Sequence, residues 1–142
     1  MVASFTESLG KTANVRWNLL ETGRDKNISP DEIIRQTFIK KPEINMVICL
    51  SLEDTLRVTQ SVIDLSKTGQ IKIIGFHESA KTLEYLSKGI LSAIISFEPE
   101  EIGKRAMKEI FDYKQHGYAN GYIVNDINVI TKETLSRREH LK

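Results

Sequence analysis

The sequence is poor in the residues that build most catalytic and metal sites. It has one cysteine, three histidines and three prolines in 142 residues. The single cysteine, Cys49, excludes an internal disulfide, and because it lies inside an apolar run we expect a buried, inert thiol. The histidines lie far apart along the chain and have no metal-ligand spacing to Cys49. The sequence therefore predicts no metal site.

Long runs of one residue class are also missing. No apolar run approaches the roughly 20 residues that a membrane helix needs, and the N-terminal stretch MVASFTESLGK lacks the basic and apolar regions of a signal peptide. The net charge is +1 and the basic pairs are short, so nothing predicts nucleic-acid binding. No Walker loop, nucleophile elbow or dinucleotide-binding glycine motif occurs. We therefore expect neither an enzyme nor a cofactor.

What is present is an alternation of short apolar runs with amphipathic stretches. This pattern is typical of parallel strands covered by helices on both faces, an α/β fold in one domain. The expected strands are 15–21, 44–50, 71–76, 91–97 and 122–131. The expected helices are 2–9, 53–67, 79–87, 99–115 and one that starts at Pro30 and ends before Pro42.

Local signals mark several helix ends. Ser29, Pro30 and Glu32 form the sequence pattern of an N-cap, a first-turn proline and a capping box. Gly69 and Gly117 are the expected C-terminal stops of the helices that precede them. Residues after Thr131 are polar, so we expect a fraying tail there. The expected domain spans 1–135, and 136–142 is the tail.

The stretch from Ile71 to Phe111 resembles a known family. Its phrases IIGF, KGILSAII and PEEIGKRA are similar to the C-terminal lobe of the type-I periplasmic (sugar-type) binding proteins, a lobe shared with the effector domains of LacI-type repressors. The phrase VITKE near the C-terminus resembles the ending of secreted solute-binding proteins, and the resemblance runs from about Val2 to Leu135. The matching residues are Gly75, Phe76, Gly89, Ala93, Pro99, Ile102, Gly103 and Ala106.

The resemblance implies that the N-terminal lobe is missing. In the family, a further strand precedes the helix at 2–9 and lies centrally in the sheet, and the helix at 99–115 packs on the other lobe. Without that lobe an apolar stripe on this helix is uncovered, so we expect the chain to self-associate. The stripe consists of Ile102, Ala106, Met107, Ile110 and Phe111.

The candidate ligand site follows from the sheet. Ligands of such sheets bind beyond the carboxyl ends of the strands. The residues at or just past the ends of the strands expected at 44–50, 71–76 and 91–97 are Ser51 and Glu53, His77 and Glu78, and Phe97. We expect Ser51, His77 and Phe97 to face one concavity, with Phe97 stacking on a flat ligand. The alternatives are a helix cap for Ser51, a loop residue for His77 and a core aromatic for Phe97.

The same positions depart from the family. Its sugar-binding members usually carry Asn-Asp where this chain has Ser51-Leu52, Asp where it has His77, and often Gln where it has Phe97. Such polar side chains specify sugar hydroxyls. The resemblance therefore implies a sugar-like ligand but does not carry over the usual pentose or hexose contacts.

The predicted function is non-enzymatic binding of a sugar-like solute. The protein would be the binding component of a transporter, with a permease as partner, or the ligand-sensing partner of a signalling receptor. Its location would be extracellular or periplasmic. The alternative is the effector-binding domain of a LacI-type repressor, which would be cytoplasmic.

Overall fold

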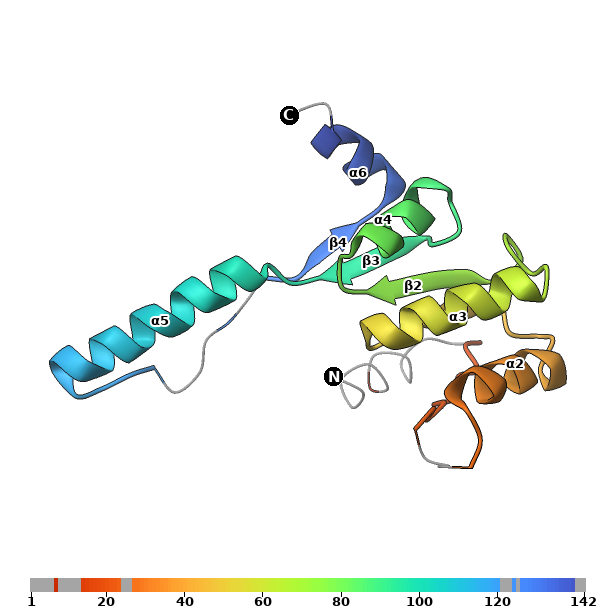
Figure 1. Cartoon of the computed structure of the whole chain (residues 1–142), viewed down its shortest axis with the longest axis horizontal. Coiled ribbons are helices and arrows are strands. Elements are labelled where there is room, and N and C mark those ends of the chain that lie inside the picture. The colour runs from red at the N-terminus through yellow and green to blue at the C-terminus, as the bar shows by residue number, and fades with distance from the viewer. Residues whose placement is uncertain (1–6, 8–13, 24–26, 121–123, 125, 140–142) are drawn as a thin grey trace.

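The computed structural model describes residues 7, 14–23, 27–120, 124 and 126–139 (Figure 1). The helix expected at 2–9 lies outside the described residues except for Glu7. The elements run in the order α2 (Pro30–Lys40), β1 (Met46–Ile48), α3 (Leu52–Asp64), β2 (Lys72–Phe76), α4 (Ala80–Ser87), β3 (Ala93–Ser96), α5 (Pro99–His116), β4 (Asn128–Ile130) and α6 (Lys132–Glu139).

The four strands form one sheet in the order β1-β2-β3-β4. β1, β2 and β3 are parallel, and β4 is antiparallel to β3 with Ser96 opposite Asn128 and Ile94 opposite Ile130. The parallel strands confirm the α/β fold predicted from the apolar runs at 44–50, 71–76 and 91–97. The strand predicted at 122–131 is shorter than expected, and its antiparallel direction was not predicted.

The helices α2, α3, α4 and α6 form a row in which each contacts the next. Successive side chains of a strand point to opposite faces of the sheet, and the two faces differ in how deeply their side chains are buried. Ile73, Ile94 and Ile130 are almost fully buried in the core, whereas the alternate residues Ile74 and Ile95 are only half-buried. The sequence predicts helices on both faces of the sheet, and the described helices that contact one another form this single row.

Serine side chains cap three of the helices. Ser29 accepts a hydrogen bond from the Glu32 backbone N–H, as predicted, but the Glu32 carboxylate accepts from Gln36 instead of completing a capping box. The reciprocal box occurs at Ser79 and Thr82, at the start of α4.

Of the two helix ends predicted from glycines, the one at Gly117 is correct and the one at Gly69 is wrong. Gly117 ends α5 in the left-handed conformation, with φ at 76°. The helix predicted over 53–67 ends earlier, at Asp64, and Ser66 adopts the left-handed φ of 55° before Gly69 is reached. The stop assigned to Gly69 was therefore wrong by several residues.

The strand predicted at 15–21 is wrong. These residues are neither strand nor helix, and Val15, Trp17 and Leu19 are about half exposed. Alternating apolar residues form a strand only when a neighbour supplies backbone hydrogen bonds. In the described part of the chain no strand pairs with this segment.

The tail predicted after Thr131 is also wrong, because α6 begins at Lys132. The Thr131 and Thr134 side chains each bond the other's backbone N–H, at 3.4 and 2.8 Å, which satisfies donors at the start of the helix. Leu135 packs against the core. The predicted domain boundary between 135 and 136 falls inside this helix.

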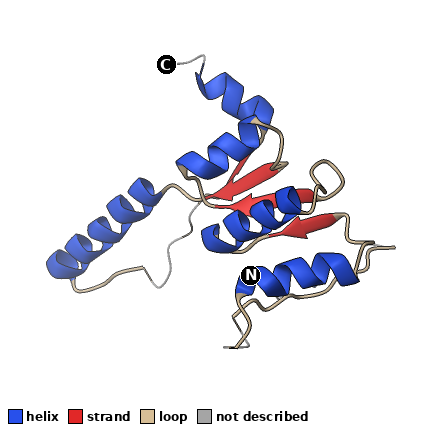
Figure 2. Ribbon diagram, turned by 45° about the vertical axis from the view of Figure 1, so that its right-hand side comes forward, coloured by secondary structure: helices blue, strands red, loops and turns tan. Residues whose placement is uncertain are grey.

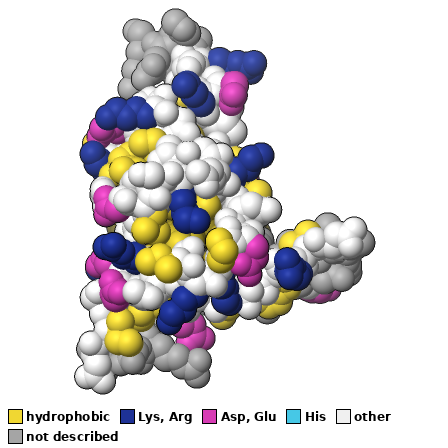
Figure 3. All heavy atoms as spheres, turned by 90° about the vertical axis from the view of Figure 1, so that its right-hand side faces the viewer, with side chains coloured by type: hydrophobic (Ala, Val, Ile, Leu, Met, Phe, Trp, Pro, Cys, Tyr) yellow, Lys and Arg dark blue, Asp and Glu magenta, His cyan; other side chains and the backbone are white. Residues whose placement is uncertain are grey.

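Helix α5 extends away from the sheet, and no residue in it is buried (Figures 1 and 2). The predicted apolar stripe is uncovered: Met107, Ile110 and Phe111 are 66%, 53% and 60% exposed. We call α5 and the described residues of the return segment, 117–120, 124 and 126–127, the arm. On the face that Figure 3 shows, hydrophobic side chains are interspersed with charged ones.

Close packing of α3 on β2 gives a test of the fold. A Cβ at Gly75 would lie 2.7 Å from Cγ2 of Thr55. Thr55 is fully buried and fixed, because its hydroxyl donates to the Ser51 carbonyl and accepts from the Phe76 N–H. We expect Gly75→Ala to lower the free energy of unfolding by about 1–3 kcal/mol in urea titrations.

Gly103→Ala is the matched control. Nothing lies within 4 Å of a Cβ at Gly103, in the second turn of α5. Alanine there should leave the stability unchanged or raise it by about 0.5–1 kcal/mol. Equal stability of Gly75→Ala and the parent protein would contradict the close approach.

Candidate functional site

The carboxyl ends of β1, β2 and β3 lie at one edge of the sheet, because the three strands are parallel. Ser51 follows β1 at the start of α3, His77 directly follows β2, and Phe97 directly follows β3. All three are half-buried. The topology brings these predicted site residues to the same edge, which we call the carboxyl edge. Whether they contact a ligand stays a prediction.

Ser51 serves first as a helix cap. Its hydroxyl oxygen accepts from the Asp54 N–H at 3.0 Å and donates to Oδ2 of Asp54 at 2.8 Å. The other Asp54 oxygen, Oδ1, accepts from the Thr22 hydroxyl at 3.0 Å. This cluster of Ser51, Asp54 and Thr22 fixes the start of α3, so the hydroxyl of Ser51 is already committed.

His77 has a constrained backbone. Its φ is 71°, an uncommon value for a residue other than glycine. Its N–H donates to the Ile95 carbonyl at 2.8 Å, and its carbonyl accepts from the Thr82 hydroxyl at 3.2 Å. Contacts to β3 on one side and to α4 on the other therefore hold this residue where β2 ends. Glu78 follows it and is half-buried.

Phe97 forms an aromatic pair with Phe76. The ring centroids are 5.6 Å apart and the planes meet at 67°, an edge-to-face geometry. Phe97 is half-buried, so its exposure is intermediate between that of a core aromatic and that of an open stacking platform. The pair joins the ends of β2 and β3.

Glu53 lies at the margin of the carboxyl edge, in the first turn of α3. Its carboxylate binds Arg57, which also binds Asp31 of α2. The hydrogen bond that Arg57 donates to Glu53 is the largest cause that raises the pKa of Arg57. Glu53 is therefore held in a surface ion pair within α3, and Arg57 links this pair to α2.

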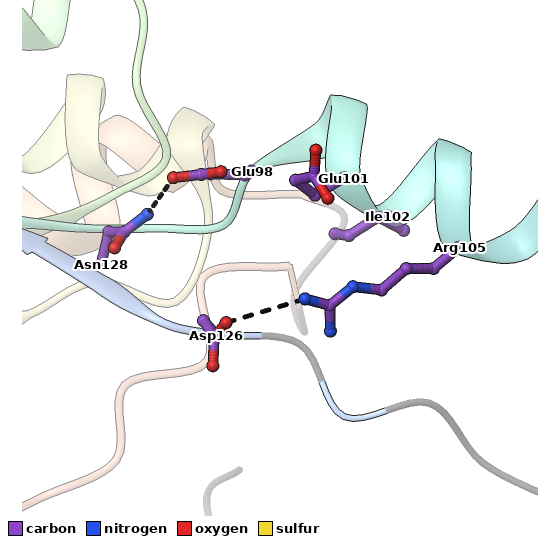
Figure 4. A pocket seen from close by; sticks show the side chains of 6 residues that line it. All are labelled: Glu98, Glu101, Ile102, Arg105, Asp126 and Asn128. Atoms are coloured by element: carbon purple, nitrogen blue, oxygen red, sulfur yellow. Dashed lines mark hydrogen bonds and ion pairs between the residues drawn. The ribbon is translucent and has the colours of Figure 1, made fainter.

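A cavity that sequence reasoning missed lies at the root of the arm. It has a volume of about 280 Å³, and Figure 4 shows its lining. Asn128 donates to the Glu98 carboxylate at 2.9 Å, and the Arg105 guanidinium lies 3.8 Å from Asp126. The lining residues are Glu98, Glu101, Ile102, Arg105, Asp126 and Asn128.

These residues are up to 30 positions apart, and no spacing in the sequence marks them. Of the lining residues, the sequence singled out Ile102, as part of the predicted apolar stripe. Lys104 holds the pKa of Glu101 below its usual value through a hydrogen bond.

Among the described residues no group of three or more ligating side chains could hold a metal ion. None of the described helices is long and apolar enough to cross a membrane.

Comparisons with known proteins agree with this fold. No protein-family model matches the chain. The D-allose-binding periplasmic protein of Escherichia coli (strain K12) is 20% identical over 112 residues, which cover 79% of this chain and 36% of that protein. A chain from a mutant XylFII–LytSN complex is 26% identical, with a TM-score of 0.76 over 93% of this chain and 47% of that one.

A third relative is GanP, a glucose-galactose binding protein from Geobacillus stearothermophilus, with a TM-score of 0.84 and 24% identity over 94% of this chain and 48% of that one. The chain shares the fold of the type-I periplasmic sugar-binding proteins. This confirms the resemblance found in the sequence. The chain spans about half the length of the solved relatives and about a third of the curated one.

The buried thiol behind the carboxyl edge gives a test of this packing. Cys49, directly after β1, is 4% exposed, and burial raises its pKa to about 12. At pH 8 on the order of 10⁻⁴ of the thiol is then ionised. We expect almost no reaction with Ellman's reagent in the native protein and one equivalent after denaturation. Prompt reaction in the native state would mean that this part of the core is open.

Proposed function

We propose that this chain is the ligand-binding C-terminal lobe of a solute-binding protein for a sugar-like ligand, with no enzymatic role. The observation that carries the proposal is the carboxyl edge, where His77 and Phe97 follow neighbouring parallel strands in a fold shared with sugar-binding proteins. The relatives named for their ligands are binding proteins. They favour this function over the alternative of a LacI-type repressor domain.

At this edge we assign different roles to the predicted residues. Phe97 offers a ring face for stacking on a sugar ring, while its edge-to-face contact with Phe76 holds it in place. His77 and Glu78 supply hydrogen-bonding groups for hydroxyls. Ser51 and Glu53 belong to the margin of the site, because Asp54 and Arg57 already engage their side chains.

A second lobe completes the proposed site. A pocket that holds a small ligand buries most of its surface, and one open sheet edge covers only part of it. We propose that the apolar face of the arm packs on this second lobe in a longer protein. Ligand binding then closes the two lobes over the carboxyl edge.

The likeness to XylFII bears on the choice between transport and sensing. XylFII occurs in a complex with a second protein, LytSN. A further chain from such a complex is 31% identical to this chain over 73% of it, and a XylFII molecule is 32% identical over 72%. These identities exceed the 24% found for GanP. We therefore propose an extracellular or periplasmic protein that passes its ligand signal to a partner receptor, with a transport permease as the second candidate.

Nuclear magnetic resonance titration tests the site directly. Adding common pentoses and hexoses to the ¹⁵N-labelled chain should shift the amide signals of 51–54, 76–79 and 96–98. The dissociation constant should be millimolar or weaker, because one lobe covers only part of the ligand. Micromolar affinity would show that no second lobe is needed. Shifts confined to the arm or to α2 would contradict the assigned edge.

Phe97→Ala separates stacking from core packing. If the ring stacks on the sugar, the substitution should weaken binding by about 1–3 kcal/mol while the amide spectrum of the core stays that of the folded protein. Phe111→Ala is the control, because Phe111 is 60% exposed on the arm and should not affect binding. Loss of folding without a separate binding defect would assign Phe97 to the core.

We also propose that the chain self-associates when it is alone, because nothing in the described residues covers the apolar stripe of α5. Sedimentation equilibrium at micromolar concentration should show a dimer or larger species. Met107→Glu and Ile110→Glu, at exposed positions, should shift it to a monomer without loss of helix content. A parent protein that stays monomeric would contradict the proposal.

A further inference from the structure

The arm joins the sheet through two neighbouring crossings of the chain. The outgoing crossing runs from Ser96 to Pro99, and the returning one reaches β4 at Asn128. Ser96 and Asn128 are opposite each other in the antiparallel β3–β4 pair. The crossings therefore lie side by side at one corner of the sheet (Figure 1).

The two parts of the arm are fastened to each other. Arg105 donates to the Val124 carbonyl at 2.6 Å. One turn further along α5, Glu109 accepts from the backbone N–H of Asn120 at 2.9 Å and from its side-chain amide at 2.6 Å. These bonds lower the pKa of Glu109. Because the ties are spread along the helix, α5 and its return segment form one body.

Packing does not fix the angle between this body and the sheet. No residue of α5 is buried. The cavity of about 280 Å³ lies at the root, lined on one side by Glu98 and residues of α5 and on the other by Asp126 and Asn128, so packed side chains do not fill this space. At the root, Asn128 on the returning crossing donates to Glu98 on the outgoing one at 2.9 Å, as Figure 4 shows.

We propose that the Glu98–Asn128 hydrogen bond is a conformational latch that sets the resting angle of the arm, with the two crossings as its hinge. It joins the residue before α5 to the first residue of β4, so it can hold only when the crossings keep one relative position. Its acceptor is a carboxylate, which makes this bond stronger than one between neutral groups. The latch concerns the chain itself and acts with or without a ligand.

Distances between spin labels test the latch. Ala80→Cys on α4 and Gln115→Cys near the tip of α5 place nitroxides on exposed positions of the sheet body and the arm. Cys49 is buried and takes no label. An excess of unlabelled protein removes distances between copies. The parent pair should give one narrow distance distribution in double electron–electron resonance.

Asn128→Asp breaks the latch, because it removes the donor and sets two carboxylates against each other. We expect a broader distribution with a shifted mean. The double variant Glu98→Gln with Asn128→Asp restores one amide donor and one carboxylate acceptor in swapped places, and it should recover the narrow distribution. Lys104→Gln, which breaks only the exposed Glu101–Lys104 pair within α5, is the control and should change nothing.

Two results would overturn the latch. One is an unchanged distribution in Asn128→Asp, and the other is a double variant as broad as the single one. Circular dichroism and the amide spectrum establish that each variant is folded. Neither result bears on the sugar site, because the experiment contains no ligand. Failure of the latch and failure of the proposed function can therefore be told apart.

Discussion

The antiparallel pairing of β3 with β4 is the contact on which the rest of the structure depends. It returns the chain to the sheet after a long excursion and places Asn128 opposite Ser96. It also buries Ile130 in the core, after which α6 packs Leu135 beside it. Without this pairing the arm would be a C-terminal extension with one free end. With it, the arm is a loop fastened at both ends, whose direction relative to the sheet is a property of the fold.

The parallel strands impose the second constraint, an open edge. Three strands end together, and the helices that follow two of them begin with Ser51 and Ser79 as caps. These serines use their hydroxyls to satisfy backbone N–H groups of the helices. The aromatic pair of Phe76 and Phe97 and the constrained His77 are left as the distinctive groups of the edge. The proposed ligand site depends on these groups.

The sequence predicted best where local chemistry decides the structure. Apolar runs located β1, β2 and β3, and Ser29 and Gly117 marked helix ends correctly. Prediction failed where contacts with another part of the chain decide the structure. Residues 15–21 alternate like a strand but have no partner in the described sheet. Helix α6 was missed because its residues are polar, although the Thr131–Thr134 pair is a capping signal that could have been read.

The candidate site divides in the same way. Topology alone brings Ser51, His77 and Phe97 to one edge, and the sequence predicted this from strand order. The cavity at the root of the arm was out of reach, because Glu98 and Asn128 meet only through the β3–β4 register. A side-chain contact over 30 residues leaves no periodic signal in the sequence. The positive φ of His77 was equally invisible, since no glycine marks the position.

Small-angle X-ray scattering, extrapolated to zero concentration, tests the central claim that the arm extends from the sheet and leaves the carboxyl edge open. A compact domain of 142 residues has a radius of gyration of about 14.5 Å. Helix α5 alone is about 27 Å long at 1.5 Å per residue. With the arm extended, the radius of gyration should lie clearly above the compact value and the distance distribution should be asymmetric. A radius at the compact value, with a symmetric distribution, would contradict it by showing that the arm folds back onto the sheet.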